Sequence, residues 1–127
     1  MKRLLLAALT VTSLPTAVSS CADDDSPTGS VVPATVIAAD YRYSGLPATA
    51  SRGDTLNLTV VNQGGLRHNL EISTPTGQRV ARLEAIGPGS TATLSAHLTE
   101  VGRYRVICDV DDHLVRGMKA TIEVTTA

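Results

Sequence analysis

The chain has 127 residues and a formal net charge of −1 at pH 7; 43% of its residues are hydrophobic and 18% are charged. This length leaves room for one domain, which excludes a multi-domain enzyme, and the near-neutral charge argues against nucleic acid as a partner. Three Tyr are the only aromatic residues. Since Thr, Val and Ala recur throughout, the composition favours short strands over long helices.

Residues 1–20 have the order of a secretory signal. Lys2 and Arg3 precede an apolar run from Leu4 to Leu9, and small residues follow up to Ser20. The apolar run is too short and too interrupted to cross a bilayer, which takes roughly 20 predominantly apolar residues. We therefore expect residues 1–20 to be a signal peptide that is removed on export.

The four residues that end at Cys21, Val-Ser-Ser-Cys, resemble the lipobox of bacterial lipoproteins. The resemblance implies that Cys21 becomes the lipidated first residue of the mature protein; ordinary cleavage that leaves Cys21 as a free thiol is the alternative. Residues 21–30 have no large apolar side chain and predict a flexible acidic linker. The domain is then expected at the outer face of the bacterial cytoplasmic membrane or in the cell envelope, held there by its lipid anchor.

Residues 31–127 predict an all-β sandwich of about seven or eight strands. Apolar and polar residues alternate with period two through most of this region, and Gly-Pro-rich turns separate the runs. Around residues 76–90 a short helix or a loop is the alternative to a strand. The predicted strands cover residues 31–39, 54–61, 66–73, 80–86, 91–98, 103–108 and 119–124.

Candidate metal ligands gather between the last two predicted strands. Cys108 shares a face with Tyr104, which points its thiol into the sandwich; four residues separate Cys108 from His113, and four more separate His113 from Met118. A thiolate, an imidazole and a thioether together suit copper in both of its oxidation states. His68 is the fourth candidate, because it follows a Gly-Gly turn and alternates with Leu66, Leu70 and Ile72, an apolar set that is expected to face the core together with it.

Each of these residues taken alone has a simpler explanation. A single inward Cys acts as a small hydrophobic residue in most proteins, a single inward His is more often a satisfied core histidine, and a lone Met fills space. His97 alternates with Thr and Ser and belongs to the exposed face. The combination of Cys-x4-His-x4-Met with an upstream His-Asn pair is what indicates a copper site.

The segments 62–69 and 102–118 resemble those of cupredoxins, the type 1 blue copper proteins of the plastocyanin, azurin and halocyanin kind. The resemblance implies a Greek-key β-sandwich that holds one copper ion through His68, Cys108 and His113, with Met118 as a weak axial ligand. It also implies that Asn69 and the backbone around Asp109 brace the sulfur. Such a closed site carries single electrons between redox partners and is not that of an enzyme.

The resemblance further implies that the outer ring edge of His113 reaches the surface beside Leu114 and Val115. Where relatives tend to have Pro-Gly before this histidine, the chain has Val110-Asp-Asp112. The carboxylates of Asp111 and Asp112 either form a solvated face or select a cationic redox partner. We expect a monomer.

The sequence offers three alternative functions. A multicopper oxidase or nitrite reductase needs histidines beside the cysteine, and here Ile107 and Asp109 flank Cys108. A copper-binding module for storage, delivery or sensing without electron shuttling is the stronger alternative, and a metal-free sandwich for adhesion is the third.

Overall fold

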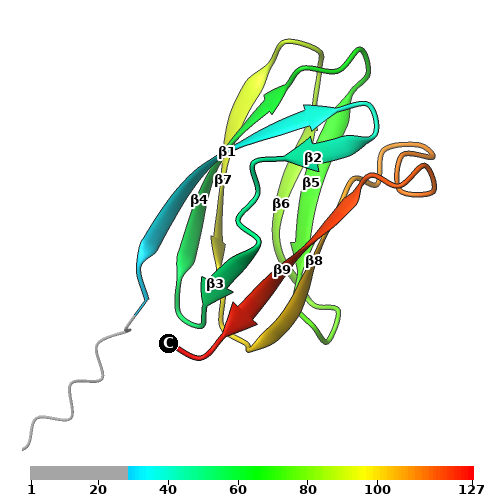
Figure 1. Cartoon of the computed structure of the whole chain (residues 1–127). Helices are drawn as coiled ribbons and strands as arrows, with labels where there is room; N and C mark the ends of the chain where they lie inside the picture. The colour runs from blue at the N-terminus through cyan, green and yellow to red at the C-terminus, as the bar shows by residue number, and fades with distance from the viewer. Residues whose placement is uncertain (1–28) are drawn as a thin grey trace, which may run out of the picture.

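The computed structural model describes residues 29–127, which form a two-layer β-sandwich (Figure 1). The predicted signal peptide, Cys21 and most of the predicted linker lie outside these residues. One layer is a four-stranded sheet in the order β2-β1-β4-β7, and the other is a five-stranded sheet in the order β3-β9-β8-β5-β6. The strands are β1 (Val31–Ala39), β2 (Arg42–Ser44), β3 (Thr49–Ser51), β4 (Thr55–Asn62), β5 (His68–Ser73), β6 (Arg79–Ile86), β7 (Thr91–His97), β8 (Gly102–Ile107) and β9 (Lys119–Thr125).

The prediction of an all-β sandwich is confirmed, with nine strands among the described residues where seven or eight were expected. The two additional strands, β2 and β3, have three residues each, too few to show an alternating pattern. Around residues 76–90, where a short helix or a loop was the alternative to a strand, the structure has the strand β6. No helix of a length and apolar character suited to crossing a membrane occurs within residues 29–127.

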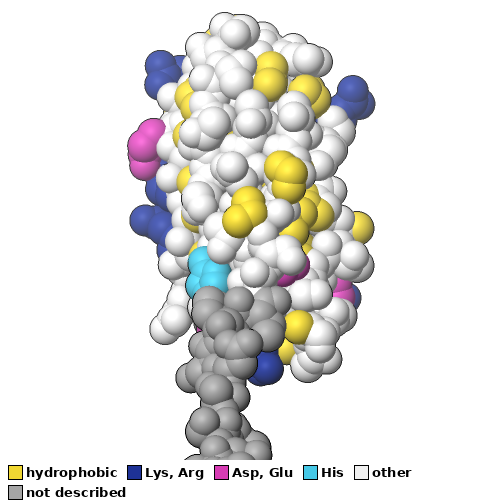
Figure 2. Space-filling view, turned by 90° about the vertical axis from the view of Figure 1, so that its left-hand side faces the viewer, with side chains coloured by type: hydrophobic (Ala, Val, Ile, Leu, Met, Phe, Trp, Pro, Cys, Tyr) yellow, Lys and Arg dark blue, Asp and Glu magenta, His cyan; other side chains and the backbone are white. Residues whose placement is uncertain are grey.

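The hydrophobic core lies between the two sheets. In β4 the even-numbered residues Leu56, Leu58 and Val60 are at most 1% exposed, and the largest fully buried side chain is Tyr104 on β8. Burying one Leu or Val side chain stabilises the fold by about 1.5–3 kcal/mol. The outer faces of β4 and β7 instead carry Thr, Asn and Ser, and Figure 2 shows that most charged side chains on this side of the molecule gather at its edges.

Three connections meet at one end of the sandwich. The chain passes from the four-stranded sheet to the five-stranded sheet between β4 and β5, and returns between β6 and β7. The β1–β2 turn, the β4–β5 turn and the β8–β9 loop bring together residues that lie far apart in the sequence, such as Tyr41 and His113. This end of the fold therefore carries the predicted ligands.

The start of β5 departs from simple alternation. His68, Asn69 and Leu70 are all buried, since the pairing register with β6 shifts between His68 and Leu70 as in a β-bulge. Leu66, which was expected to face the core together with His68, lies in the preceding turn and is 42% exposed. The bulge turns two consecutive polar side chains, His68 and Asn69, inward.

Candidate metal centre

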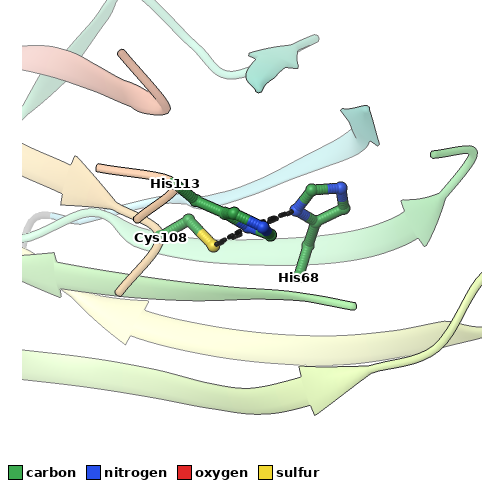
Figure 3. A group of neighbouring side chains, drawn as sticks. All are labelled: His68, Cys108 and His113. Carbon is green, nitrogen blue, oxygen red and sulfur yellow. Dashed lines mark hydrogen bonds between the residues drawn. The ribbon is translucent and has the colours of Figure 1, made fainter. Parts of the chain in front are cut away.

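Three of the four candidate ligands meet in the interior. His68 opens β5, Cys108 directly follows β8, and His113 lies in the β8–β9 loop; all three are at most 2% exposed. His113 Nδ1 lies 3.2 Å from His68 Nδ1 and 3.5 Å from Cys108 Sγ, and the sulfur lies 4.0 Å from His68 Nδ1. Figure 3 shows the two rings and the thiol pointing toward one another.

The dimensions of this triangle suit a metal ion. An ion about 2 Å from each nitrogen and slightly further from the sulfur would hold the three atoms about 3.5–4 Å apart. The distances of 3.2, 3.5 and 4.0 Å bracket this separation. Two imidazoles and one thiol are also the donor set that suits copper. The His68-Cys108-His113 cluster therefore fits a type 1 copper site.

Met118 stands at the end of the same loop and is fully buried in the core cluster that includes Cys108. Its backbone N–H donates to the carbonyl of His113, and its own carbonyl accepts a hydrogen bond from the N–H of Cys108. These bonds tie the two ends of the loop together. They place Met118 beside both ligands along the backbone, and its role as the axial ligand stays a prediction.

The β8–β9 loop is a series of tight turns. The N–H of His113 donates to the carbonyl of Val110, and Arg116 and Gly117 donate to carbonyls three or four residues earlier. Asp111 has a φ of 44°, in the left-handed region that few residues other than Gly, Asn and Asp enter readily. The unusual Asp at this position is thus compatible with the turn that presents His113.

A network of polar side chains holds the backbone next to Cys108. Asn69 donates from Nδ2 to Asp109 Oδ1 at 2.6 Å, and its Oδ1 accepts from the N–H of Asp109 at 2.9 Å. Arg82 on β6 binds both oxygens of Asp109 and also Glu71, which lowers the pKa of Asp109. The residue after the cysteine is therefore fixed to two neighbouring strands, β5 and β6.

Tyr43 on β2 contributes to the same region from the other sheet. Its hydroxyl donates to the backbone carbonyl of Asn69. Burial raises the pKa of Tyr43, and the nearby thiol of Cys108 raises it further. The phenol therefore remains protonated at physiological pH and can keep this hydrogen bond.

The expectation that the ring edge of His113 reaches the surface is wrong for this structure, in which His113 is only 2% exposed. The ring of Tyr41 covers it edge-on, with the ring centroids 5.1 Å apart. The guanidinium of Arg116 lies 5.0 Å from the centroid of Tyr41 and pairs with Asp112 at 2.7 Å. Val115 is 90% exposed and Leu114 is partly buried.

Asp40, in the β1–β2 turn, contacts His68 on the side away from Cys108. Its Oδ1 lies 2.6 Å from His68 Nε2, and its Oδ2 accepts a hydrogen bond from the N–H of Gly65. The bond from Gly65 and the contact with His68 lower the pKa of Asp40. Sequence reasoning missed Asp40, Tyr41 and Arg82, since none lies near a ligand in the sequence.

The sequence matches no protein-family model and no curated protein, but many solved structures are similar. Auracyanin from Roseiflexus castenholzii has a TM-score of 0.65 and 19% identity, covering 76% of this chain and 96% of that one. Auracyanin A from Chloroflexus aurantiacus, described as a "blue" copper protein, has a TM-score of 0.64 and 15% identity, covering 75% and 99%. Rusticyanin from Thiobacillus ferrooxidans has a TM-score of 0.63 and 18% identity, covering 75% and 77%.

A multicopper oxidase also matches, with a TM-score of 0.61 and 19% identity over 76% of this chain, although only 42% of the oxidase is covered. At these identities the similarity establishes the fold, which is that of the cupredoxins.

Proposed function

We propose that the protein is a mononuclear blue copper protein that carries single electrons between redox partners outside the cytoplasmic membrane. The observation that carries this proposal is the buried triangle of His68, Cys108 and His113 at one end of a cupredoxin fold. Auracyanin and rusticyanin structures with the same fold support it. Met118 completes the proposed ligand set, and one copper ion is the proposed content.

Copper supplies the one-electron couple when it is bound. The chain holds the ligands still: the loop ends are joined between Cys108 and Met118, and Asn69 fixes the backbone at Asp109. Burial of all three donor side chains keeps water away from the site. A site that changes little between oxidation states exchanges electrons with little reorganisation. With four protein ligands it would also leave no open position for a substrate, unlike a catalytic metal site.

The test is the addition of Cu(II) to the purified protein. An intense visible charge-transfer band with a reversible one-electron couple is expected. A colourless complex would remove the type 1 assignment, and a band without a reversible couple would favour copper storage, delivery or sensing. A multicopper oxidase is disfavoured because Ile107 and Asp109, rather than histidines, flank Cys108.

The location is also proposed, with support from the sequence alone. Lipidation at Cys21 after removal of residues 1–20 would anchor a monomeric domain at the outer face of the membrane or in the cell envelope. Metabolic labelling with a fatty acid in a bacterial host tests this: wild-type protein should take up the label, and a Cys21→Ala variant should not.

The redox partner is proposed to be cationic, and the exposed acidic residues of the β8–β9 loop support this. Asp112 is paired with Arg116, whereas Asp111 has no ion pair among residues 29–127. Exchange with a cationic ruthenium ammine complex should slow by a few-fold at low salt in Asp111→Asn/Asp112→Asn. Asn suits the left-handed position 111, so the turn should persist.

Arg116→Gln is the matched control, because it removes a positive charge from the same loop and should have the opposite effect on the rate. Without the Arg116 guanidinium, Asp112 loses its ion pair, so electron exchange with the same cationic complex should become faster. With an anionic iron cyanide complex, Arg116→Gln should be slower than the wild type and Asp111→Asn/Asp112→Asn should be faster. Both effects should fade toward 0.15 M salt, where the screening length is about 8 Å. Equal rates for wild type and both variants at low salt would contradict the proposal.

A further inference from the structure

The Asp40 carboxylate bridges a proposed ligand and the turn that leads to it. One oxygen contacts His68 Nε2 at 2.6 Å, and the other accepts a hydrogen bond from the N–H of Gly65 at 3.0 Å. The turn is shaped for this contact: a Cβ added to Gly64 would lie 2.2 Å from Asp40 Oδ1 and 2.8 Å from His68 Nε2. Glycine at position 64 therefore allows the carboxylate and the ring to meet.

The contact defines which nitrogen of His68 carries the proton. An ionised carboxylate only accepts hydrogen bonds, so Nε2 must be the protonated nitrogen. In a neutral imidazole the lone pair then lies on Nδ1. That nitrogen is the one that faces His113 Nδ1 and Cys108 Sγ. Asp40 thus leaves His68 in the tautomer that a metal ion at the centre of the triangle requires.

We propose that Asp40 is a positioning residue that fixes the tautomer and orientation of His68 and lowers the reduction potential of the site. This inference rests on the proposed function. A negative charge one imidazole ring from the metal favours the more highly charged oxidation state, and a hydrogen bond from Nε2–H to a carboxylate makes the ligand more basic. Both effects stabilise Cu(II) over Cu(I). The side chain is 34% exposed, which moderates the effect of the charge without removing it.

Asp40→Asn is the decisive variant, because it keeps the size of the side chain and one acceptor oxygen but removes the charge. The charge-transfer band should remain and the reduction potential should rise above that of the wild type. Mutation of the outer partner of a metal-binding histidine commonly weakens metal binding 10- to 100-fold, and we expect removal of the Asp40 charge to have an effect of about this size for Cu(II) and a smaller one for Cu(I).

Asp54→Asn is the matched control. The Asp54 carboxylate also accepts two backbone hydrogen bonds, from Ser30 and Ser51, both at 2.9 Å, and these bonds lower its pKa. It precedes β4, whose far end at Asn62 leads to the ligand turn. Asp54→Asn therefore removes the same charge and weakens a turn, but at a point about 25 Å along β4 from the ligand turn. Asp54→Asn should therefore lower the melting temperature without moving the potential.

A pair of glycine variants tests the contact without changing any charge. Gly64→Ala places a methyl group against Asp40 and His68, whereas in Gly65→Ala the methyl group would lie 3.5 Å from Asp40 Oδ2, an ordinary contact. The potential and the Cu(II) affinity should change in the first variant and stay near wild type in the second.

The copper-free protein provides an independent measurement. Nitrogen-15 NMR should show His68 protonated at Nε2 in the wild type, and a mixture of tautomers in Asp40→Ala. An unchanged or lowered potential in Asp40→Asn, or a wild-type His68 protonated at Nδ1, would overturn the inference. Absence of the charge-transfer band in the wild type would instead refute the proposed function, and the tautomer measurement would still decide the role of Asp40.

Discussion

Replacing Cys108 by Ser is expected to abolish the visible charge-transfer band completely, because the band requires a bond between a thiolate sulfur and copper. Its side chain is fully buried beside the two histidines, and Cys108 is the only cysteine among residues 29–127, so no other thiolate can take its place. A hydroxyl cannot supply the soft donor that stabilises Cu(I). Absorption spectra during Cu(II) titration, together with voltammetry, measure the loss.

Two controls separate this effect from general damage. Cys21→Ala removes the only other cysteine of the chain and should leave the band unchanged. His97→Gln removes a histidine from the exposed face of β7, where its ring contacts Thr55, and should also have no effect. A band that persists in Cys108→Ser, or that disappears in either control, would contradict the assignment of the ligands.

The strands were predictable because alternation is local information. Each of the strands β4, β7, β8 and β9 has one face toward the core and one toward the solvent. Apolar and polar residues therefore alternate in the sequence of each strand. The prediction was wrong at the start of β5, where the bulge buries His68 and Asn69 together and where Leu66 lies in the turn before the strand and is exposed. This bulge depends on how β5 pairs with β6, and the sequence of β5 alone does not determine that pairing.

The grouping of His68, Cys108 and His113 could be proposed from the sequence because the last two share one short loop with regular spacing. The surrounding residues could not. From the sequence, Arg82 is one of several charged residues in its segment, although in the structure it binds Asp109 beside the cysteine from the edge strand β6. Asp40 and Tyr41 lie in a turn that approaches the histidines only through the parallel pairing of β1 with β4. Contacts between elements distant in sequence are set by sheet topology rather than by local pattern.

The second large effect is expected at Tyr104, the largest fully buried side chain. Tyr104→Ala should lower the free energy of unfolding by about 3–5 kcal/mol, the usual cost of removing a buried aromatic ring. Tyr104→Phe keeps the ring and removes only the hydroxyl that accepts a hydrogen bond from the N–H of Glu100, so it should cost about 1 kcal/mol. Urea denaturation of the copper-free protein measures both values, and a cost of Tyr104→Ala below that of Tyr104→Phe would contradict this account of the core.

Tyr104 and Cys108 lie on the same face of the β8 segment, so the stability of the core and the binding of the metal are coupled through one strand. A ligand that binds only the folded state stabilises it by about 4 kcal/mol at 1,000 times its dissociation constant. Copper should therefore restore most of the stability lost in Tyr104→Ala if that variant still folds, and it should add nothing to Cys108→Ser. The same stabilisation by copper in both variants would mean that the metal binds outside the triangle of His68, Cys108 and His113.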